Sequence, residues 1–278
     1  MIYHKTYQTN KKGKHVLFFG QIHGTEPCGR FAILKLMDEL AKGTIVLKNG
    51  TVTCVPVCNE SATTMNVRFI QEDLNRVFER KVDYQTYEQD IANELCDFVD
   101  DCDVLLDLHS MVAKSIPTVF LDYPTTANRE LASALGVKYA LLGYNELYAK
   151  SPIVSNDTMK YASKMGKIAV TLECGQNNTP EAVEVAFNAT LGTLAHYGMI
   201  DGGQHYTPEE IHMTKLYIRK DKIDSFYKHW NHLDFIKKGE PIAIIAGKRI
   251  EAQEDCYILL PKHNWGVGKE MFYLGNRR

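Results

Sequence analysis

A histidine and a glutamate stand three positions apart in the short stretch His23-Gly24-Thr25-Glu26. Imidazole nitrogens and carboxylate oxygens are ligands that zinc takes, and a catalytic zinc site commonly combines two His and one Glu with one open position. A second histidine is therefore needed. His109 is the candidate, because it ends another apolar run of the chain. Each histidine alone is equally compatible with ordinary packing in a core or loop.

The elements that must position these side chains are short apolar runs, which predict buried strands. Functional groups in an α/β sheet gather at the carboxyl ends of its strands, so residues that end such runs are expected in one shared site. Three runs qualify, at 15–20, 104–108 and 167–172, and they lead into His23, His109 and Glu173.

Strand-like and helical patterns alternate over residues 15–200. One helix is predicted over Arg30–Leu40 and ended by Gly43, and another begins with Thr179 as N-cap and Pro180 in its first turn. The alternation predicts an α/β fold with a mixed, mostly parallel sheet covered by helices on both faces.

Three stretches of the chain differ from this pattern. Residues 1–14 predict an edge strand and hairpin, and 143–159 read as a long loop. From about residue 205 onwards, β-like stretches broken by Gly and Pro predict a small β-rich C-terminal domain. The expected division is therefore 1–204 for the α/β domain and 205–278 for the β-rich domain.

Composition narrows the class of protein. The 278 residues carry a formal net charge of −2, with 45% hydrophobic and 24% charged residues, which is typical of a globular chain and gives no basic surface for nucleic acid. No apolar run approaches the ~18 residues of a membrane helix, and the start does not resemble a signal peptide. Seven scattered cysteines argue against a disulfide framework. These features predict a cytoplasmic protein without a membrane partner.

The stretch 66–78 packs two arginines, two asparagines and an aspartate around apolar residues. An arginine guanidinium is a planar fork that binds a carboxylate through two hydrogen bonds, so an anionic substrate is one explanation. An ordinary loop held by surface ion pairs is the other explanation, and this stretch alone does not separate the two.

Taken together, the motifs resemble the succinylglutamate desuccinylase/aspartoacylase family of the zinc carboxypeptidase-like superfamily. The resemblance covers residues 15–195, and the C-terminal portion resembles the family in length and β-rich character alone. Each motif is weak by itself, but their order and spacing are specific. The motifs are His23-Gly24-Thr25-Glu26, Arg68 with Asp73-Leu74-Asn75-Arg76, Asp107-Leu108-His109 and Glu173-Cys174-Gly175.

The resemblance implies one zinc ion per chain, held by His23, Glu26 and His109. It also implies that Glu173 is the general base and acid, and that Arg68 polarises the scissile carbonyl or its oxyanion. These roles agree with the chemistry of zinc, which acidifies water and polarises a carbonyl so that a nearby carboxylate can move the proton.

Substrate recognition follows from the same resemblance. Asn75 and Arg76 are implied to bind the α-carboxylate of the substrate. The family's residues that recognise the acyl group have no match in the loop 144–159. The acyl group and the amino acid therefore stay open, as does the oligomeric state, for which a homo-oligomer is one option.

The leading functional hypothesis is a zinc-dependent amidohydrolase that cleaves a small-molecule N-acyl amino acid. A zinc metallocarboxypeptidase acting on peptide C-termini is the first rival, and the motif residues do not separate the two. The C-terminal portion favours small substrates, because in the family it narrows the active-site entrance. The second rival is a non-catalytic zinc-binding scaffold, which would be expected to lack a ligand or the base, whereas all these positions are filled here.

Overall fold

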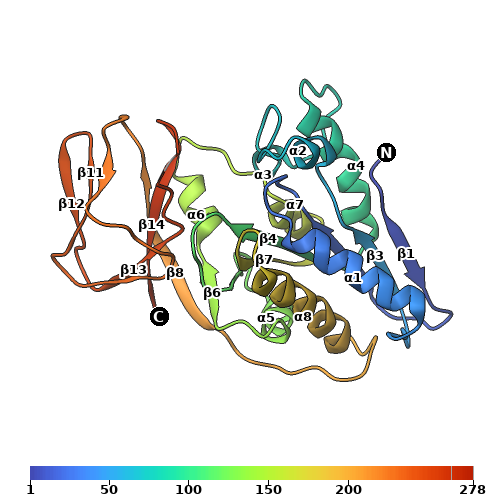
Figure 1. Cartoon of the computed structure of the whole chain (residues 1–278). Coiled ribbons are helices and arrows are strands. Elements are labelled where there is room, and N and C mark those ends of the chain that lie inside the picture. The colour runs from blue at the N-terminus through green and yellow to red at the C-terminus, as the bar shows by residue number, and fades with distance from the viewer. Residues whose placement is uncertain (264, 278) are drawn as a thin grey trace.

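One large sheet forms the framework of the fold in a computed structural model that describes residues 1–263 and 265–277. Among these residues, eleven strands hydrogen-bond side by side, and Figure 1 shows helices on both faces of the sheet's N-terminal part. In spatial order, the strands are β1 (Lys5–Gln8), β3 (Thr51–Val55), β2 (His15–Gly20), β4 (Val104–Met111), β7 (Ile168–Gln176), β5 (Thr118–Phe120), β6 (Tyr139–Leu142), β8 (Glu209–Ile218), β14 (Glu270–Arg277), β13 (Cys256–Leu259) and β10 (Phe235–Ile236).

Four neighbouring strands of the sheet, β3, β2, β4 and β7, pair in parallel, and antiparallel pairs flank them on both sides. Strand β2 pairs in parallel with β3 and β4, and β4 pairs in parallel with β7. Strands β1 and β5 run antiparallel to their neighbours β3 and β7. The predicted α/β fold with a mixed sheet covered on both faces is confirmed.

Alternate residues of β2 show why both faces must be covered. Val16 and Phe18 point into one apolar core and Leu17 and Phe19 into another, as the period of two along a strand requires. Helices α1, α5 and α8 pack on the first face and α4 and α7 on the second. The helices are α1 (Cys28–Lys42), α2 (Glu60–Thr64), α3 (Leu74–Val77), α4 (Tyr87–Asp101), α5 (Thr126–Ala134), α6 (Tyr144–Ala149), α7 (Thr158–Lys164) and α8 (Pro180–His196).

Local end signals set the bounds of the longest helices. Gly43 adopts φ 75° directly after α1, which lets the chain leave the helix in the left-handed conformation. The side chain of Thr179 accepts a hydrogen bond from the amide of Ala182, and Pro180 fills the first position of α8. Both predicted helix ends are confirmed.

Two local predictions are wrong. The stretch 143–159 is not a continuous loop, because it holds α6 and the start of α7. The amides at the start of α6, those of Tyr144 and Asn145, bond to the carboxylate of Asp122, so the cap comes from more than twenty residues away and leaves no local signal. Strand β1 is an edge strand as predicted, but it pairs with β3, so residues 1–14 form no hairpin with β2.

The C-terminal portion is β-rich, as predicted, and it extends the same sheet. Strand β8 pairs in parallel with β6, and β14 pairs with both β8 and β13. A separate small antiparallel sheet packs at the far end of the molecule (Figure 1). Its strands are β9 (Ser225–Phe226), β11 (Pro241–Ile245) and β12 (Lys248–Glu251). The division into domains at residue 205 stays a prediction.

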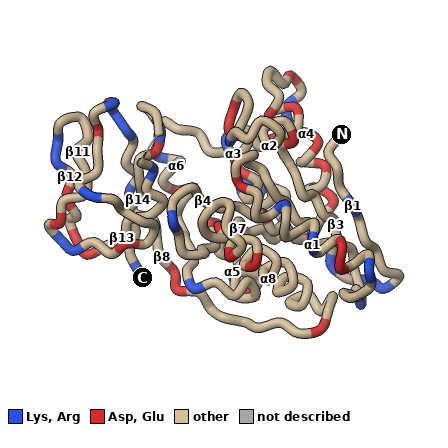
Figure 2. The backbone as a smooth tube through the Cα atoms, in the orientation of Figure 1, with Lys and Arg blue, Asp and Glu red and all other residues tan. Residues whose placement is uncertain are grey.

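Basic and acidic residues are interspersed along the whole chain, as Figure 2 shows. This distribution agrees with the formal net charge of −2. In the part of the chain that the structure describes, no helix combines the length and apolar character needed to cross a membrane.

Candidate metal centre and active site

A tight turn places His23 and Glu26 just beyond the carboxyl end of β2. Gln21 adopts φ 51°, and its side-chain amide donates to the carbonyl of Gly24 at 2.8 Å. Gly24 packs so closely on α2 that a Cβ atom there would lie 2.2 Å from the backbone carbonyl carbon of Ala62. The turn therefore needs glycine at this position, and it fixes the direction of both functional side chains.

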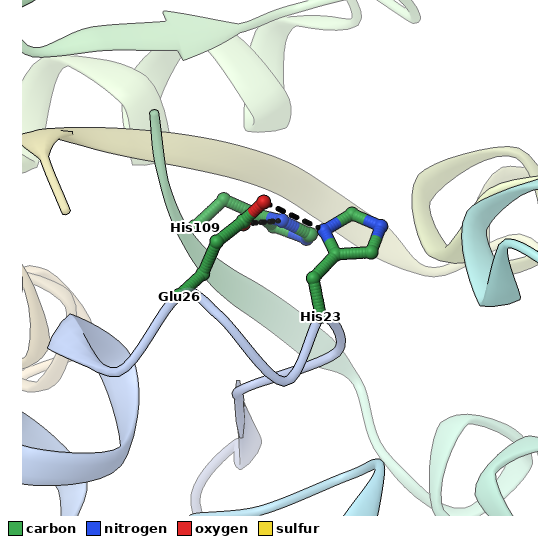
Figure 3. A group of neighbouring side chains, drawn as sticks. All are labelled: His23, Glu26 and His109. Carbon is green, nitrogen blue, oxygen red and sulfur yellow. Dashed lines mark hydrogen bonds and ion pairs between the residues drawn. The ribbon is translucent and has the colours of Figure 1, made fainter. Parts of the chain in front are cut away.

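The side chains of His23, Glu26 and His109 converge, as Figure 3 shows. His23 Nδ1 lies 3.0 Å from Glu26 Oε1, and His109 Nδ1 lies 2.9 Å from Glu26 Oε2. One potential ligand atom from each residue lies within 4.8 Å of the others, and all three side chains are buried. The structure thus brings the predicted ligand residues together.

A carboxylate lies behind each imidazole. Asp73 Oδ1 lies 3.0 Å from His23 Nε2, and Asp107 Oδ2 lies 3.0 Å from His109 Nε2. Thr158 donates a further hydrogen bond to Asp107 at 2.6 Å. Such outer carboxylates fix the orientation and tautomer of a ligating histidine, so both rings present Nδ1 to the centre of the cluster.

Electrostatics at the cluster are dominated by close opposite charges. Burial alone raises the pKa of the Glu26 carboxyl, but His23 and Arg68 hold this pKa well below its usual value. Burial lowers the pKa of His109, but Asp107 and Glu26 raise it well above its usual value. The group is therefore a compact set of opposite charges shielded from water.

The loop after α2 delivers Arg68 to the same place. Its Nη1 donates to Glu26 Oε1 at 2.6 Å, and its Nε donates to Asp73 Oδ2 at 3.2 Å. The loop is anchored by Glu88 of α4, whose buried carboxylate accepts hydrogen bonds from the backbone amides of residues 70, 71 and 72. The stretch 66–78 is thus held by partly buried ion pairs and hydrogen bonds, and its binding of an anionic substrate stays a prediction.

Glu173 lies beside the cluster on β7. His109 and Glu173 are partners in the parallel register of β4 and β7, and both strands continue beyond them, to Met111 and Gln176. Both residues therefore lie within strands, not just after them. Burial, together with Glu26, raises the pKa of the Glu173 carboxyl to about 7. A carboxyl with this pKa can both accept and donate a proton near neutral pH.

Arg76 is fixed by residues from distant parts of the chain. Its Nη2 donates to Glu270 Oε1 of β14 at 2.8 Å and to the hydroxyl of Tyr148 at 3.3 Å. Tyr148 also bonds to Glu270 and lies 2.6 Å, oxygen to oxygen, from the hydroxyl of Tyr273. The guanidinium is therefore held in one orientation at the wall of the site.

A cavity of about 90 Å³ opens above the cluster. Lys262, from the C-terminal portion, also lines it, and burial lowers the pKa of this lysine to about 8 although Glu270 opposes the shift. The sequence-predicted residues that line the cavity are His23, Arg68, Asn75, Arg76, His109 and Glu173.

Sequence reasoning did not assign roles to several residues that shape this site. Asp73 stood within a quoted motif but had no assigned function, although it contacts both His23 and Arg68. Glu270 and Lys262 carried no signal, because their partner in the N-terminal half is recognisable only in the folded chain. Glu88 is a buried acid at the start of a helix. Its position in the sequence gives only a weak indication of its role in holding the loop that carries Arg68.

An α/β sheet that gathers a buried His–Glu–His group beside a further carboxylate is typical of metal-dependent hydrolases. The chain belongs to the succinylglutamate desuccinylase/aspartoacylase family, whose catalytic-domain model matches residues 12–195. This is a family of N-acyl amino acid deacylases. The resemblance seen in the motifs is thereby confirmed.

Individual relatives agree with this assignment. The N-alpha-acetyl-L-2,4-diaminobutyric acid deacetylase of Halomonas elongata is 32% identical over 203 residues, which is 69% of this chain. The match spans 57% of that protein's length.

Solved structures show the same fold. Succinylglutamate desuccinylase/aspartoacylase from Rhodobacter sphaeroides superposes with a TM-score of 0.79 at 18% identity, covering 99% of this chain and 88% of that one. The product-bound ectoine utilization protein EutE (DoeB) from Ruegeria pomeroyi gives a TM-score of 0.79 at 18% identity, with coverage of 98% and 88%.

Proposed function

We propose that this chain is a zinc-dependent hydrolase that cleaves the amide bond of an N-acyl amino acid into a carboxylate and a free amino acid. The observation that carries the proposal is the buried group of His23, Glu26 and His109, with ligand atoms within 4.8 Å of one another and the carboxylate of Glu173 lining the same cavity. Membership of a deacylase family supports the reaction type.

The residues fit one zinc ion. Two imidazole nitrogens and a carboxylate form a donor set that catalytic zinc sites use. In the described residues, the buried His23 Nδ1 has no hydrogen-bond partner of good geometry, although Glu26 lies nearby. Asp73 and Asp107 occupy the opposite ring nitrogens, which leaves Nδ1 of each histidine for a metal. Bound there, zinc polarises a carbonyl and lowers the pKa of water from ~15.7 to about 7.

Glu173 is proposed to move the proton. Its Oε2 atom is buried and, within the described residues, has no hydrogen-bond partner. A carboxylate so placed takes a proton from the attacking water and passes it to the leaving nitrogen. Arg68, which carries more N–H donors than its bonds to Glu26 and Asp73 use, stabilises the oxyanion that develops on the scissile carbonyl.

Asn75 and Arg76 are proposed to bind the α-carboxylate of the substrate. The side-chain amide of Asn75 can donate to a carboxylate through Nδ2, which lies 3.4 Å from His109 Nε2, whereas its buried Oδ1 is an acceptor. Arg76 is held by Glu270 and Tyr148, so its guanidinium is oriented before a substrate arrives. Pre-orientation lowers the entropy that binding must overcome.

Residues 205–278 are proposed to narrow the entrance, as the resemblance to the family implies. Leu260, Lys262 and Tyr273 line the 90 Å³ cavity together with the candidate catalytic residues. These side chains limit the space beside the candidate catalytic residues, and the printed name of the Halomonas elongata relative is that of an enzyme for a small N-acyl amino acid. The cytoplasmic location inferred from the sequence stays a prediction.

The experiment that tests this function combines metal content with hydrolysis. Zinc-loaded protein is incubated with N-acetyl, N-succinyl and N-formyl amino acids beside short peptides, with Glu173→Gln as the disabled variant and the exposed Glu184→Gln as its matched control. We expect release from acyl amino acids and a loss of about 100- to 10,000-fold in Glu173→Gln alone.

Other outcomes separate the rivals. Cleavage of peptides alone identifies a carboxypeptidase. Absence of stoichiometric zinc, with a metal content unchanged by His23→Ala, refutes the metal site. Bound zinc without any hydrolysis across the panel favours a non-catalytic scaffold.

A further inference from the structure

The 90 Å³ cavity at the cluster adjoins a larger cavity of about 480 Å³. Arg68 and Arg76 line both, so these side chains form the wall between them. Thr25, next to the candidate ligand Glu26, also faces the larger cavity. The outer cavity therefore borders the proposed catalytic site, and its volume lies within the range of roughly 300–1,000 Å³ typical of small-molecule sites.

The outer cavity is walled by apolar side chains from separate segments. Phe69 belongs to the loop that carries Arg68, Val112 follows β4, Ile153 follows α6, and Trp265 comes from the C-terminal portion. Val112 is 79% exposed. Apolar side chains that gather at an open cavity, with water as their present neighbour, are typical of a binding surface.

Charged groups at this cavity are already paired or lie at its rim. Asp73 is bonded to Arg68, and Glu270 to Arg76. The Lys269 side chain is exposed at the rim. Apart from the spare N–H groups of Arg68, the surface that remains for a ligand is mostly apolar, and Lys269 is the exposed charged side chain among the described residues that line it.

We propose that the outer cavity binds an apolar acyl chain of the substrate, longer than an acetyl group. This inference rests on the proposed function. With the α-carboxylate at Asn75 and Arg76 and the scissile carbonyl at Arg68, the acyl chain continues past Arg68 into the outer cavity. The volume of 480 Å³ is about three times that of a ~150 Å³ apolar cavity that accommodates benzene, so an unbranched chain of several carbons fits.

Trp265 gives the acyl chain a flat apolar surface. Its ring lies 3.5 Å from Lys262 Nζ and 5.4 Å from the guanidinium carbon of Arg68, measured to the ring centroid. These cations hold the indole in place and lie toward the catalytic cavity. The specificity residues for the acyl chain are thus Phe69, Val112, Ile153 and Trp265.

Chain length is the first test. For the amino acid that the hydrolysis panel releases fastest, kcat/KM is measured with N-acetyl, N-butanoyl, N-hexanoyl and N-succinyl derivatives. Complete burial of a methylene corresponds to about fourfold. We expect a rise of at least about tenfold from acetyl to hexanoyl, because part of the chain stays near solvent.

The outcomes distinguish the two proposals. A kcat/KM that is flat or falls with chain length, or is highest for the succinyl derivative, which would pair with Lys269, overturns the apolar acyl site and leaves the deacylase function intact. Hydrolysis of none of these compounds overturns the deacylase function itself.

Variants locate the effect. Val112→Asp places a charge in the outer cavity, and Val82→Asp places one on a valine that is 96% exposed and lines neither cavity. We expect Val112→Asp to lower kcat/KM for the hexanoyl substrate by about tenfold and to leave the acetyl substrate within about twofold. Equal losses for both substrates, or the same loss in Val82→Asp, would refute the assignment.

Binding without turnover provides an independent readout. The other tryptophan, Trp230, is fully buried, so a change in emission on adding sodium hexanoate reports on Trp265. We expect hexanoate to shift the emission to shorter wavelength, sodium succinate to have no effect, and Trp265→Phe to remove the response. No shift with hexanoate, or an equal shift with succinate, contradicts the proposal.

Discussion

Glu88 offers the sharpest test of how the loop that carries Arg68 is positioned. This carboxylate is completely buried in the first turn of α4. Its Oε1 accepts hydrogen bonds from the amide of Ile70 at 2.7 Å and from Asn59 Nδ2 at 3.4 Å. Its Oε2 accepts from the amides of Gln71 and Glu72 at 3.1 and 3.2 Å. Four donors thus depend on one side chain.

The substitution Glu88→Gln keeps the shape and changes the hydrogen bonding. A glutamine amide has one oxygen and one NH₂ group, so in either orientation two of the four donors face another donor. A hydrogen bond to a charged group contributes about 1.5–3 kcal/mol, so the loss is about 3–6 kcal/mol. This is a large part of the roughly 5–15 kcal/mol that stabilises a typical domain.

Urea unfolding measures the global effect, and hydrogen exchange at the amides of residues 70–72 measures the local one. We expect a lower midpoint and faster exchange in Glu88→Gln, together with a reduced kcat because Arg68 loses its fixed position. Glu146→Gln, at an exposed position of α6, is the control. If Glu88→Gln unfolds within about 0.5 kcal/mol of the unmodified protein, the reasoning from these four hydrogen bonds is wrong.

Other predictions concern pH, packing and substrate binding. Burial lowers the pKa of His232 to about 3 from roughly 6.5 in the unfolded chain, so its contribution to stability is complete above pH 6.5 and decreases by at most ~1.4 kcal/mol per pH unit as the pH falls toward 3. Between pH 5 and 7, the free energy of unfolding of His232→Gln, measured with denaturant, should change less with pH than that of the unmodified protein. An equal dependence on pH would contradict the assignment. Gly24→Ala should lower the free energy of unfolding by about 1–3 kcal/mol, because the new methyl group meets the backbone of Ala62. A thermal unfolding midpoint equal to that of the unmodified protein would refute this. Arg76→Lys should raise KM about tenfold or more with little change in kcat. Arg80→Lys, at a surface ion pair, is the control and should change neither constant. Equal KM values in the two variants would show that the α-carboxylate of the substrate binds elsewhere.

Local signals made much of the fold predictable. The apolar runs of β2, β4 and β7 are short, buried and continuous, as strands covered on both faces must be. Gly43 and Thr179 mark helix ends through backbone conformation and side-chain capping, which depend on neighbouring residues alone. The structure brings the predicted ligands together because their strands are adjacent and parallel.

The missed features depend on contacts between distant residues. Helix α6 is capped by Asp122 rather than by a neighbour, so residues 143–159 looked like a loop. The pairing of Arg76 with Glu270 joins positions 194 residues apart. Such pairs arise from the order of strands in the sheet, and no spacing of residues in the sequence predicts them. The contact of Glu270 with Arg76 at the site could therefore not be predicted from the sequence.

The position of β14 in the sheet has a consequence for how the protein matures. This last strand inserts between β8 and β13, and it brings Glu270 to Arg76. Ribosomes add about 5–20 residues per second, and N-terminal segments begin to fold first. The candidate metal ligands His23, Glu26 and His109 are thus made well before residue 270. Arg76 gains its partner only after β14 has been made, so we expect chains cut before β14 to lack the hydrogen bond that orients this guanidinium.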